Sequence, residues 1–137
     1  MKRKFKVLTI LSILTVLGLS QVGSIKAAEI GYWDETDGYS ITENLNSSKV
    51  RSKPKHTGKS EKKGIGGTDH KRAVGKTEWA GVYHYTRARL IDKTLMINWG
   101  TIKDSNRKWG TGKTTATTEW WPMNPDVYAQ ARTNYGN

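Results

Sequence analysis

The chain has 137 residues, no cysteine and a formal net charge of +11, from 23 basic and 12 acidic side chains. The absence of cysteine excludes a disulfide-bonded scaffold. The length suits one small domain, and the basic excess favours an anionic partner.

A secretory leader is predicted at the start of the chain. The basic stretch MKRKFK precedes an apolar run, Val7–Leu19, and small residues surround Ala27 and Ala28. This is the layout of a signal peptide, and the run is shorter than the about 20 residues of a transmembrane helix. We therefore expect residues 1–28 to be removed and the protein to be secreted and extracellular, with a mature net charge of +6.

Two segments of opposite charge follow the leader. Residues 29–48 form an acidic aromatic arm without Lys or Arg, in which Tyr32, Trp33 and Tyr39 favour docking on the main unit as an edge strand. Residues 49–76, KVRSKPKHTGKSEKKGIGGTDHKRAVGK, are strongly basic and offer few side chains to bury. Burial in this second segment cannot offset the entropy of ordering its backbone, so we predict a basic flexible segment.

Residues 77–137 are predicted to be the β domain. The stretch WAGVYHYTRARLI, residues 79–91, alternates between a largely apolar face with His84 and a second face that bears Tyr and Arg. Alternation of this kind predicts a half-buried strand. The fold class is therefore mainly β, a small antiparallel sheet or β-sandwich, behind a flexible basic N-terminal half.

Further strands and one helix are predicted after this strand. TLMINWGTI, WGTG and the Thr-rich TTATTEWW favour strands, and KDSNRK favours a turn between them. NPDVYAQAR predicts a short C-terminal helix, because Asn124 can cap its start and Pro125 suits the first helical position.

Two Gly-Lys-Thr triplets, residues 75–77 and 112–114, have the spelling of a phosphate-binding loop. Such a loop also needs a glycine five positions before its second glycine, and these positions hold His70 and Arg107. Thr-rich sequence follows in place of a helix, so the chain predicts no nucleotide site. Gly110 and Gly112 are instead expected to relax a turn or bulge.

Catalysis remains the alternative interpretation. A small secreted hydrolase, either a nuclease or a cell-wall-active enzyme, could use His84, with Arg87 and Arg89 in the nuclease, or the adjacent pair at residues 69–70. However, His84 lies on the apolar face, which is more typical of a core residue, and no histidine pair has metal-ligand spacing. We therefore expect a binding protein rather than an enzyme, with no catalytic residue, metal ion or cofactor.

The predicted binding surface combines aromatic and basic side chains. Tyr and Trp join an apolar ring to a polar group, and Arg guanidinium groups bind phosphate through two hydrogen bonds. Surfaces of this kind bind anionic polymers, although an ordinary edge strand with cross-strand aromatic pairs has the same pattern. The candidate ligand-binding residues are Tyr83, Tyr85, Arg87, Arg89, Trp99, Trp109 and Trp120.

The passages EWAGVYHYTRARLI and DSNRKWGTGKTTATTEWW resemble small secreted Gram-positive proteins and, more distantly, lactococcin-type bacteriocins. AGVY, residues 80–83, stands where that family has a small-small-Val-aromatic step, and GYWDETDGY echoes its Gly/Trp/Tyr-rich start. The family's histidine-serine stretch is matched only by KHTGKS. The resemblance implies a small β-sandwich that acts on neighbouring bacteria at cell-wall synthesis. The expected partners are an anionic cell-envelope polymer or lipid-linked wall precursor, and an immunity protein; a non-toxic carbohydrate- or envelope-binding module remains open.

Overall fold

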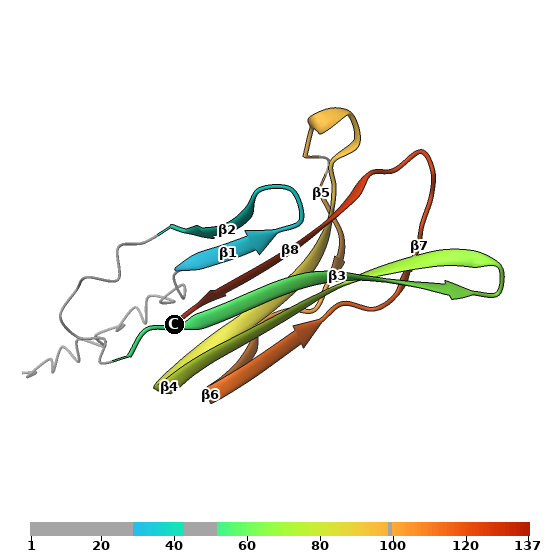
Figure 1. The fold of residues 1–137 in the computed structure, drawn as a ribbon. Helices are drawn as coiled ribbons and strands as arrows, with labels where there is room; N and C mark the ends of the chain where they lie inside the picture. The colour runs from blue at the N-terminus through green and yellow to red at the C-terminus, as the bar shows by residue number, and fades with distance from the viewer. Residues whose placement is uncertain (1–28, 43–51, 99) are drawn as a thin grey trace, which may run out of the picture.

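The computed structural model describes residues 29–42, 52–98 and 100–137 (Figure 1). They form one antiparallel sheet, so the mainly β fold class is confirmed. The predicted leader and part of the arm lie outside the described residues. The strands are β1 (Gly31–Asp34), β2 (Gly38–Ile41), β3 (Lys55–Ile65), β4 (Thr68–Asp92), β5 (Gly100–Asp104), β6 (Lys108–Thr117), β7 (Trp121–Pro122) and β8 (Ala129–Gly136).

Strand β4 organises the sheet because it is 25 residues long and pairs along both edges. One edge pairs with β3 and then β8, and the other pairs in turn with β7, β6 and β5. The register against β6 shifts between Trp79 and Tyr83, where Gly81 has a φ of +72° and Gly112 of β6 has a φ of +84°. These left-handed conformations suit glycine, so Gly112 lies at a bulge as predicted, whereas Gly110 has no positive φ and both glycines lie within β6 rather than between two strands.

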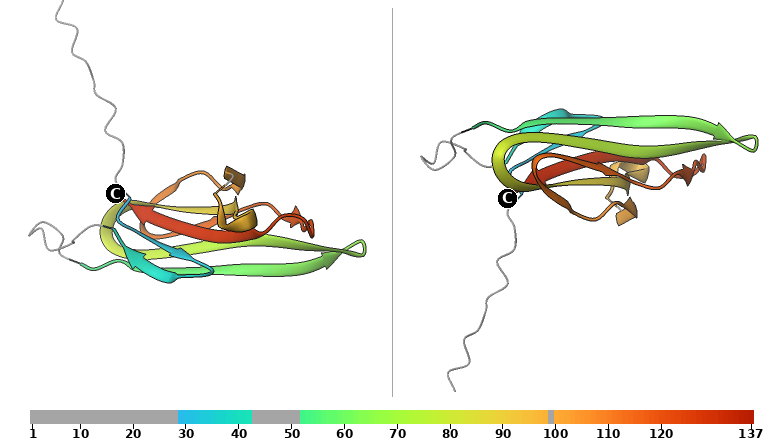
Figure 2. Two further views of the ribbon diagram at one scale, coloured as in Figure 1. Left: turned by 90° about the horizontal axis from the view of Figure 1, so that it is seen from above. Right: turned by 90° about the horizontal axis from the view of Figure 1, so that it is seen from below.

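Strand β4 bends at this bulge, and the bend folds the sheet into two layers (Figure 2). The first half of β4 pairs with β3, and its second half pairs with β8, from which β1 and then β2 continue the sheet. Thr77 and Thr86, from the two halves, touch across the interior with their hydroxyl oxygens 2.6 Å apart. A side chain at Gly58 or Gly75 would collide with the facing layer, so the interior is thin.

Two apolar clusters and a polar network fill this interior. Ala73, Ala88, Leu90, Ala116 and Ala131 form one cluster, against which Trp33 and Trp121 pack, and Ile30, Trp79 and Tyr135 form the other. Between them, the buried His56 ring bonds to the hydroxyl groups of Thr77 and Thr133. Each buried polar group in this network therefore has a partner, as a low-dielectric interior requires.

Residues 55–76 are the first correction to the predictions, because they form the β3–β4 hairpin rather than a flexible segment. Gly66 and Gly67, both with positive φ, make its two-residue turn, a geometry that favours Gly-Gly. The inward side chains are small or polar, so the sequence shows no apolar alternation. Packing against the opposite layer offsets the entropy cost of ordering this hairpin. Sequence periodicity does not reveal such packing.

The predicted C-terminal helix is the second correction. Asn124 does cap a turn, since its side-chain oxygen accepts from the Asp126 N–H group at 3.0 Å, but the turn ends at once. The residues after it form β8, which hydrogen-bonds to β4 on one side and β1 on the other. The backbone hydrogen bonds to two neighbouring strands outweigh the local preference for a helix, because helix propensity contributes only tenths of a kcal/mol per residue.

The predicted strand TLMINWGTI is shorter than expected. Thr94–Met96, labelled η1, form a tight turn with non-helical backbone angles at Leu95, and β5 starts only at Gly100. Both the backbone N–H and the hydroxyl group of Thr94 donate to the Asp92 carboxylate, which turns the chain out of the sheet. In the described part of the chain, no helix has the length and apolar character needed to cross a membrane.

The acidic arm joins the sheet through its first half, since β1 pairs with β8 and β2 forms the outer edge. One ion pair ties this hairpin to β4. Lys71, whose side chain is only 5% exposed, contacts the Glu35 carboxylate at 2.5 Å and donates to the Ala129 carbonyl oxygen at 2.6 Å.

Candidate anion-binding surface

Five of the seven predicted site residues come together on the outer side of the second layer. Tyr83, Tyr85, Arg87 and Arg89 alternate along β4 with side chains buried in the interior. Trp109 of β6 pairs in register with Tyr85 and therefore lies on the same side. The shared face is the one that the sequence predicts.

Only the aromatic end of this group is open to solvent. Tyr83 is 62% exposed and Trp109 is 40% exposed, and their rings stack with centroids 5.3 Å apart. Tyr85 is buried, because the Trp109 ring tilts against it and the Arg107 guanidinium lies 4.6 Å from its centroid. We call the exposed pair, Tyr83 and Trp109, the aromatic platform.

The two arginines are bound within the sheet. Arg87 Nε donates to Asp104 Oδ1 at 2.9 Å, and a second bond joins Arg87 Nη2 to Asp104 Oδ2. This pairing raises the pKa of Arg87 and lowers the pKa of Asp104. Arg89 is partly buried, and its Nη2 donates to the Asn134 side-chain oxygen at 3.3 Å. Burial, followed by the charge of Arg87, lowers the pKa of Arg89.

One of the remaining two predicted residues lies apart from the group. Trp120 lies beyond the end of β6, with the Arg72 guanidinium 4.4 Å from its ring centroid. Trp99 lies outside the described residues.

A second surface covers the outer side of β3, the first half of β4, and β6. Residues opposite each other in adjacent antiparallel strands point to the same side, so the register fixes its composition. We call it the lysine face. Its side chains are Lys55, Thr57, Lys59, Glu61 and Lys63 from β3, His70, Arg72, Val74, Lys76 and Glu78 from β4, and Lys113, Thr115 and Thr117 from β6.

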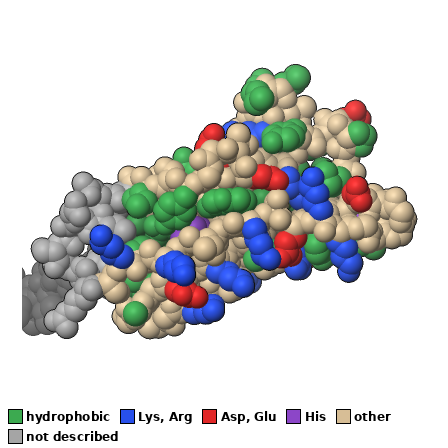
Figure 3. All heavy atoms as spheres, in the orientation of Figure 1, with side chains coloured by type: hydrophobic (Ala, Val, Ile, Leu, Met, Phe, Trp, Pro, Cys, Tyr) green, Lys and Arg blue, Asp and Glu red, His purple; other side chains and the backbone are tan. Residues whose placement is uncertain are grey.

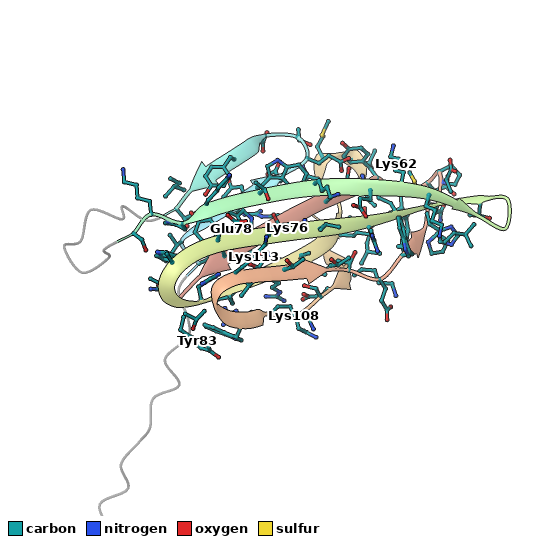
Figure 4. All side chains as sticks on the ribbon, turned by 60° about the horizontal axis from the view of Figure 1, so that its bottom comes forward. Lys62, Lys76, Glu78, Tyr83, Lys108 and Lys113 are labelled. Atoms are coloured by element: carbon teal, nitrogen blue, oxygen red, sulfur yellow. The ribbon has the colours of Figure 1, made fainter. Side chains whose placement is uncertain are left out.

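The lysine face carries six cationic side chains and two carboxylates. Glu61 pairs with Lys59 at 2.5 Å and with Arg72 at 2.6 Å, and Glu78 pairs with Lys113 at 3.3 Å. Within the described residues, Lys55, Lys63 and Lys76 form no ion pair. Basic groups gather along this side of the molecule (Figure 3), and Lys76, Glu78 and Lys113 are labelled on it in Figure 4.

A shallow hollow lies at the centre of the lysine face. Its volume is about 230 Å³, and it is lined by Thr57, Gly58, Lys59, Val74 and Lys76. In the register, Thr57 stands on one side of Lys76 and Thr115 on the other. Ammonium and hydroxyl donors therefore surround a small apolar floor, which suits an anionic group on a carbon chain or sugar.

Sequence reasoning treated these lysines as part of a flexible segment and missed the surface. One signal was available, because the Gly-Gly pair between two runs of basic residues is a hairpin turn signal. A hairpin centred there places alternate residues of both runs on one side.

Two of the three histidines, His56 and His84, are buried, whereas His70 is half-buried and its Nδ1 lies 2.9 Å from the Thr68 carbonyl oxygen. His84 is fully buried, as its position on the apolar face predicts, and its Nδ1 lies 2.8 Å from the Val82 carbonyl oxygen. His56 is 7% exposed, and burial lowers its pKa to about 4. Among the described residues, no three His, Cys, Asp or Glu side chains gather closely enough to hold a metal ion.

Comparison with known proteins adds no relative. The chain matches no family model, and no curated protein or solved structure is detectably similar to it. The resemblance to lactococcin-type bacteriocins therefore stays a prediction.

Proposed function

We propose that this protein is a secreted binding protein for an anionic polymer of the cell envelope, and that the lysine face is its main contact. The observation that carries the proposal is the excess of four positive charges on one side of three paired strands. An array of ammonium groups attracts a polyanion from a distance and neutralises several of its charges at once.

The aromatic platform supports the same function. Stacked, exposed Tyr and Trp rings fit the apolar faces of sugars, and they remain effective where salt screens charges. Arg87 has a smaller part than its sequence position suggests, because Asp104 already occupies its guanidinium group. The proposal therefore assigns attraction to the lysines and contact specificity to Tyr83 and Trp109.

The experiment compares two double variants that remove equal charge. Lys55→Gln with Lys76→Gln neutralises two lysines of the lysine face, and Lys62→Gln with Lys93→Gln neutralises two lysines elsewhere. We expect the first variant to bind a glycerol phosphate polymer about 30-fold more weakly at low salt, at about 1 kcal/mol for each lysine near an anionic surface. The control variant should lose much less, and titration calorimetry measures both.

Equal losses in the two variants would mean that net charge alone drives binding, with no role for this surface. No binding by the unaltered protein would reject the proposed function itself. Tyr83→Ala with Trp109→Ala adds a second readout, because it should weaken binding at high salt as much as at low salt.

The bacteriocin-like activity is a separate part of the proposal, and it rests on the sequence resemblance. Purified protein spotted on lawns of Gram-positive bacteria should produce clearing that the Lys55/Lys76 variant reduces. Clearing that both lysine variants preserve would separate killing from polymer binding. The hydrolase alternative has less support, because His84 is buried and the adjacent Asp69 and His70 of β4 point to opposite faces of the strand.

A further inference from the structure

A loop between β4 and β5 carries three consecutive apolar side chains into solvent. Leu95 is 81% exposed, Met96 is 90% exposed and Ile97 is 51% exposed. The loop projects from the end of the sheet (Figure 1), and apolar side chains cover its tip in the space-filling view (Figure 3). We call these three residues the apolar tip.

The backbone holds the apolar tip outward at an energetic cost. Leu95 has a φ of +58° and Met96 has a φ of +64°, in the left-handed region that disfavours residues with a side chain. The base of the loop maintains this shape, because Thr94 is bonded to Asp92 and its hydroxyl oxygen accepts from the Tyr128 N–H group at 3.1 Å. Strain retained around exposed apolar groups is typical of a contact site.

Three backbone N–H groups of the loop have hydrogen-bond partners within it. The N–H group of Met96 donates to the Lys93 carbonyl oxygen at 2.9 Å, that of Ile97 to the Thr94 carbonyl oxygen at 3.2 Å, and that of Thr94 to the Asp92 carboxylate at 2.9 Å. Unpaired N–H groups are costly in an apolar medium, and these three remain paired there. The loop can therefore leave water without losing these hydrogen bonds.

Size and shape favour a lipid surface over a protein partner. Three side chains on a convex tip supply only part of the about 800 Å² per partner that a stable protein interface buries. A bilayer interface accepts a small convex apolar group, and the half-exposed Tyr128 beside the tip is a residue type that lies at that depth.

Charge has little part in this contact. Lys93 and Asp37, which have opposite charges, both line a hollow of about 200 Å³ beside Met96. Attachment through the tip should therefore depend on apolar burial rather than on anionic lipid.

We propose that the apolar tip inserts into the interfacial layer of a lipid bilayer, as a contact separate from the polymer binding of the lysine face. The probe is a vesicle of phosphatidylcholine, which has no net charge. Sedimentation with vesicles in about 1 M salt, where the screening length falls to about 3 Å, removes the contribution of the lysine face.

The test variants are Leu95→Asn and Met96→Asn, because asparagine tolerates the left-handed backbone. Each should weaken vesicle binding about tenfold, since the burial of one large apolar side chain contributes at least that factor. Ile41→Ser is the matched control, as Ile41 is 56% exposed on β2, and its binding should not change. Both tip variants should still bind the glycerol phosphate polymer at low salt.

Failure of the unaltered protein to bind these vesicles would overturn the proposal, as would tip variants that bind as well as the unaltered protein. Sedimentation velocity without lipid tests the competing explanation, in which a second copy of the chain binds the apolar tip. A dimer that Leu95→Asn dissociates would make the tip a contact between two copies of the chain. These results are distinct from a failure of the proposed function, which concerns polymer binding at low salt.

Discussion

The buried His56 should make the fold sensitive to mild acid. Its Nδ1 lies 2.9 Å from the Thr77 hydroxyl oxygen, and its Nε2 lies 2.8 Å from the Thr133 hydroxyl oxygen. The Tyr135 ring packs with its centroid 4.8 Å away. The site therefore holds a neutral imidazole, and a proton added to the ring brings a charge into the thin interior between the layers.

The direction and size of the effect follow from the pKa. Burial lowers the pKa of His56 from 6.5 to about 4, so between these values the unfolded chain binds a proton that the folded chain excludes. Stability is therefore complete above about pH 6.5, falls as the pH drops toward 4, and falls no further from this group below 4. A shift of this size corresponds to about 3 kcal/mol, a large part of the 5–15 kcal/mol of a typical domain.

Urea unfolding at about pH 7 and about pH 4.5 measures this loss, of which about 2.5 kcal/mol should appear in that interval. The carboxyl groups with lowered pKa values, Glu35, Glu61 and Asp104, lose their stabilising charge only at lower pH. His56→Gln keeps a donor and an acceptor but cannot titrate, so its stability should be nearly flat over the same interval. Equal pH dependence in the two proteins would refute the assignment to His56.

Three further predictions concern stability and use the same urea measurement. Glu35→Ala should cost about 3 kcal/mol, because it leaves the buried Lys71 ammonium without its carboxylate, whereas Lys71→Met should cost less. Gly58→Ala should cost about 1–3 kcal/mol or more, since its Cβ atom would lie 2.2 Å from the Trp33 ring. Leu95→Gly should stabilise by about 0.5 kcal/mol, because relief of about 1–2 kcal/mol of left-handed strain exceeds the entropy of glycine; a destabilised variant would show that the strain is small.

Sequence pattern predicts the second half of β4 well and its first half poorly. From Tyr83 to Leu90 the inward residues are His, Thr, Ala and Leu, and the outward residues are Tyr and Arg. The sequence therefore alternates and predicts the strand. From Lys71 to Thr77 the inward residues are Lys, Ala, Gly and Thr, and the outward ones include Val74. Alternation is lost there because the inward side chains are small or polar where the facing layer comes close, as at Gly75.

The candidate site shows the same division. The face shared by Tyr83, Tyr85 and the two arginines follows from alternation alone, and the structure places them on one side. Their accessibility does not follow, because Asp104 and Arg107, distant in sequence, cover Arg87 and Tyr85. The lysine face was missed for the converse reason, since its existence depends on a hairpin whose order comes from tertiary packing.

The two proposed contacts depend on different physical forces, and this makes their combination informative. Salt weakens the lysine face through screening but strengthens apolar burial at the tip slightly or leaves it unchanged. On a surface that offers both an anionic polymer and a bilayer, binding of the polymer by the lysine face holds the apolar tip near the bilayer. The second binding event then occurs at a higher effective concentration. Binding to such a surface should therefore exceed either contact alone at low salt and fall to the level of the tip alone at high salt. A single salt titration on vesicles with and without attached polymer separates the two contributions.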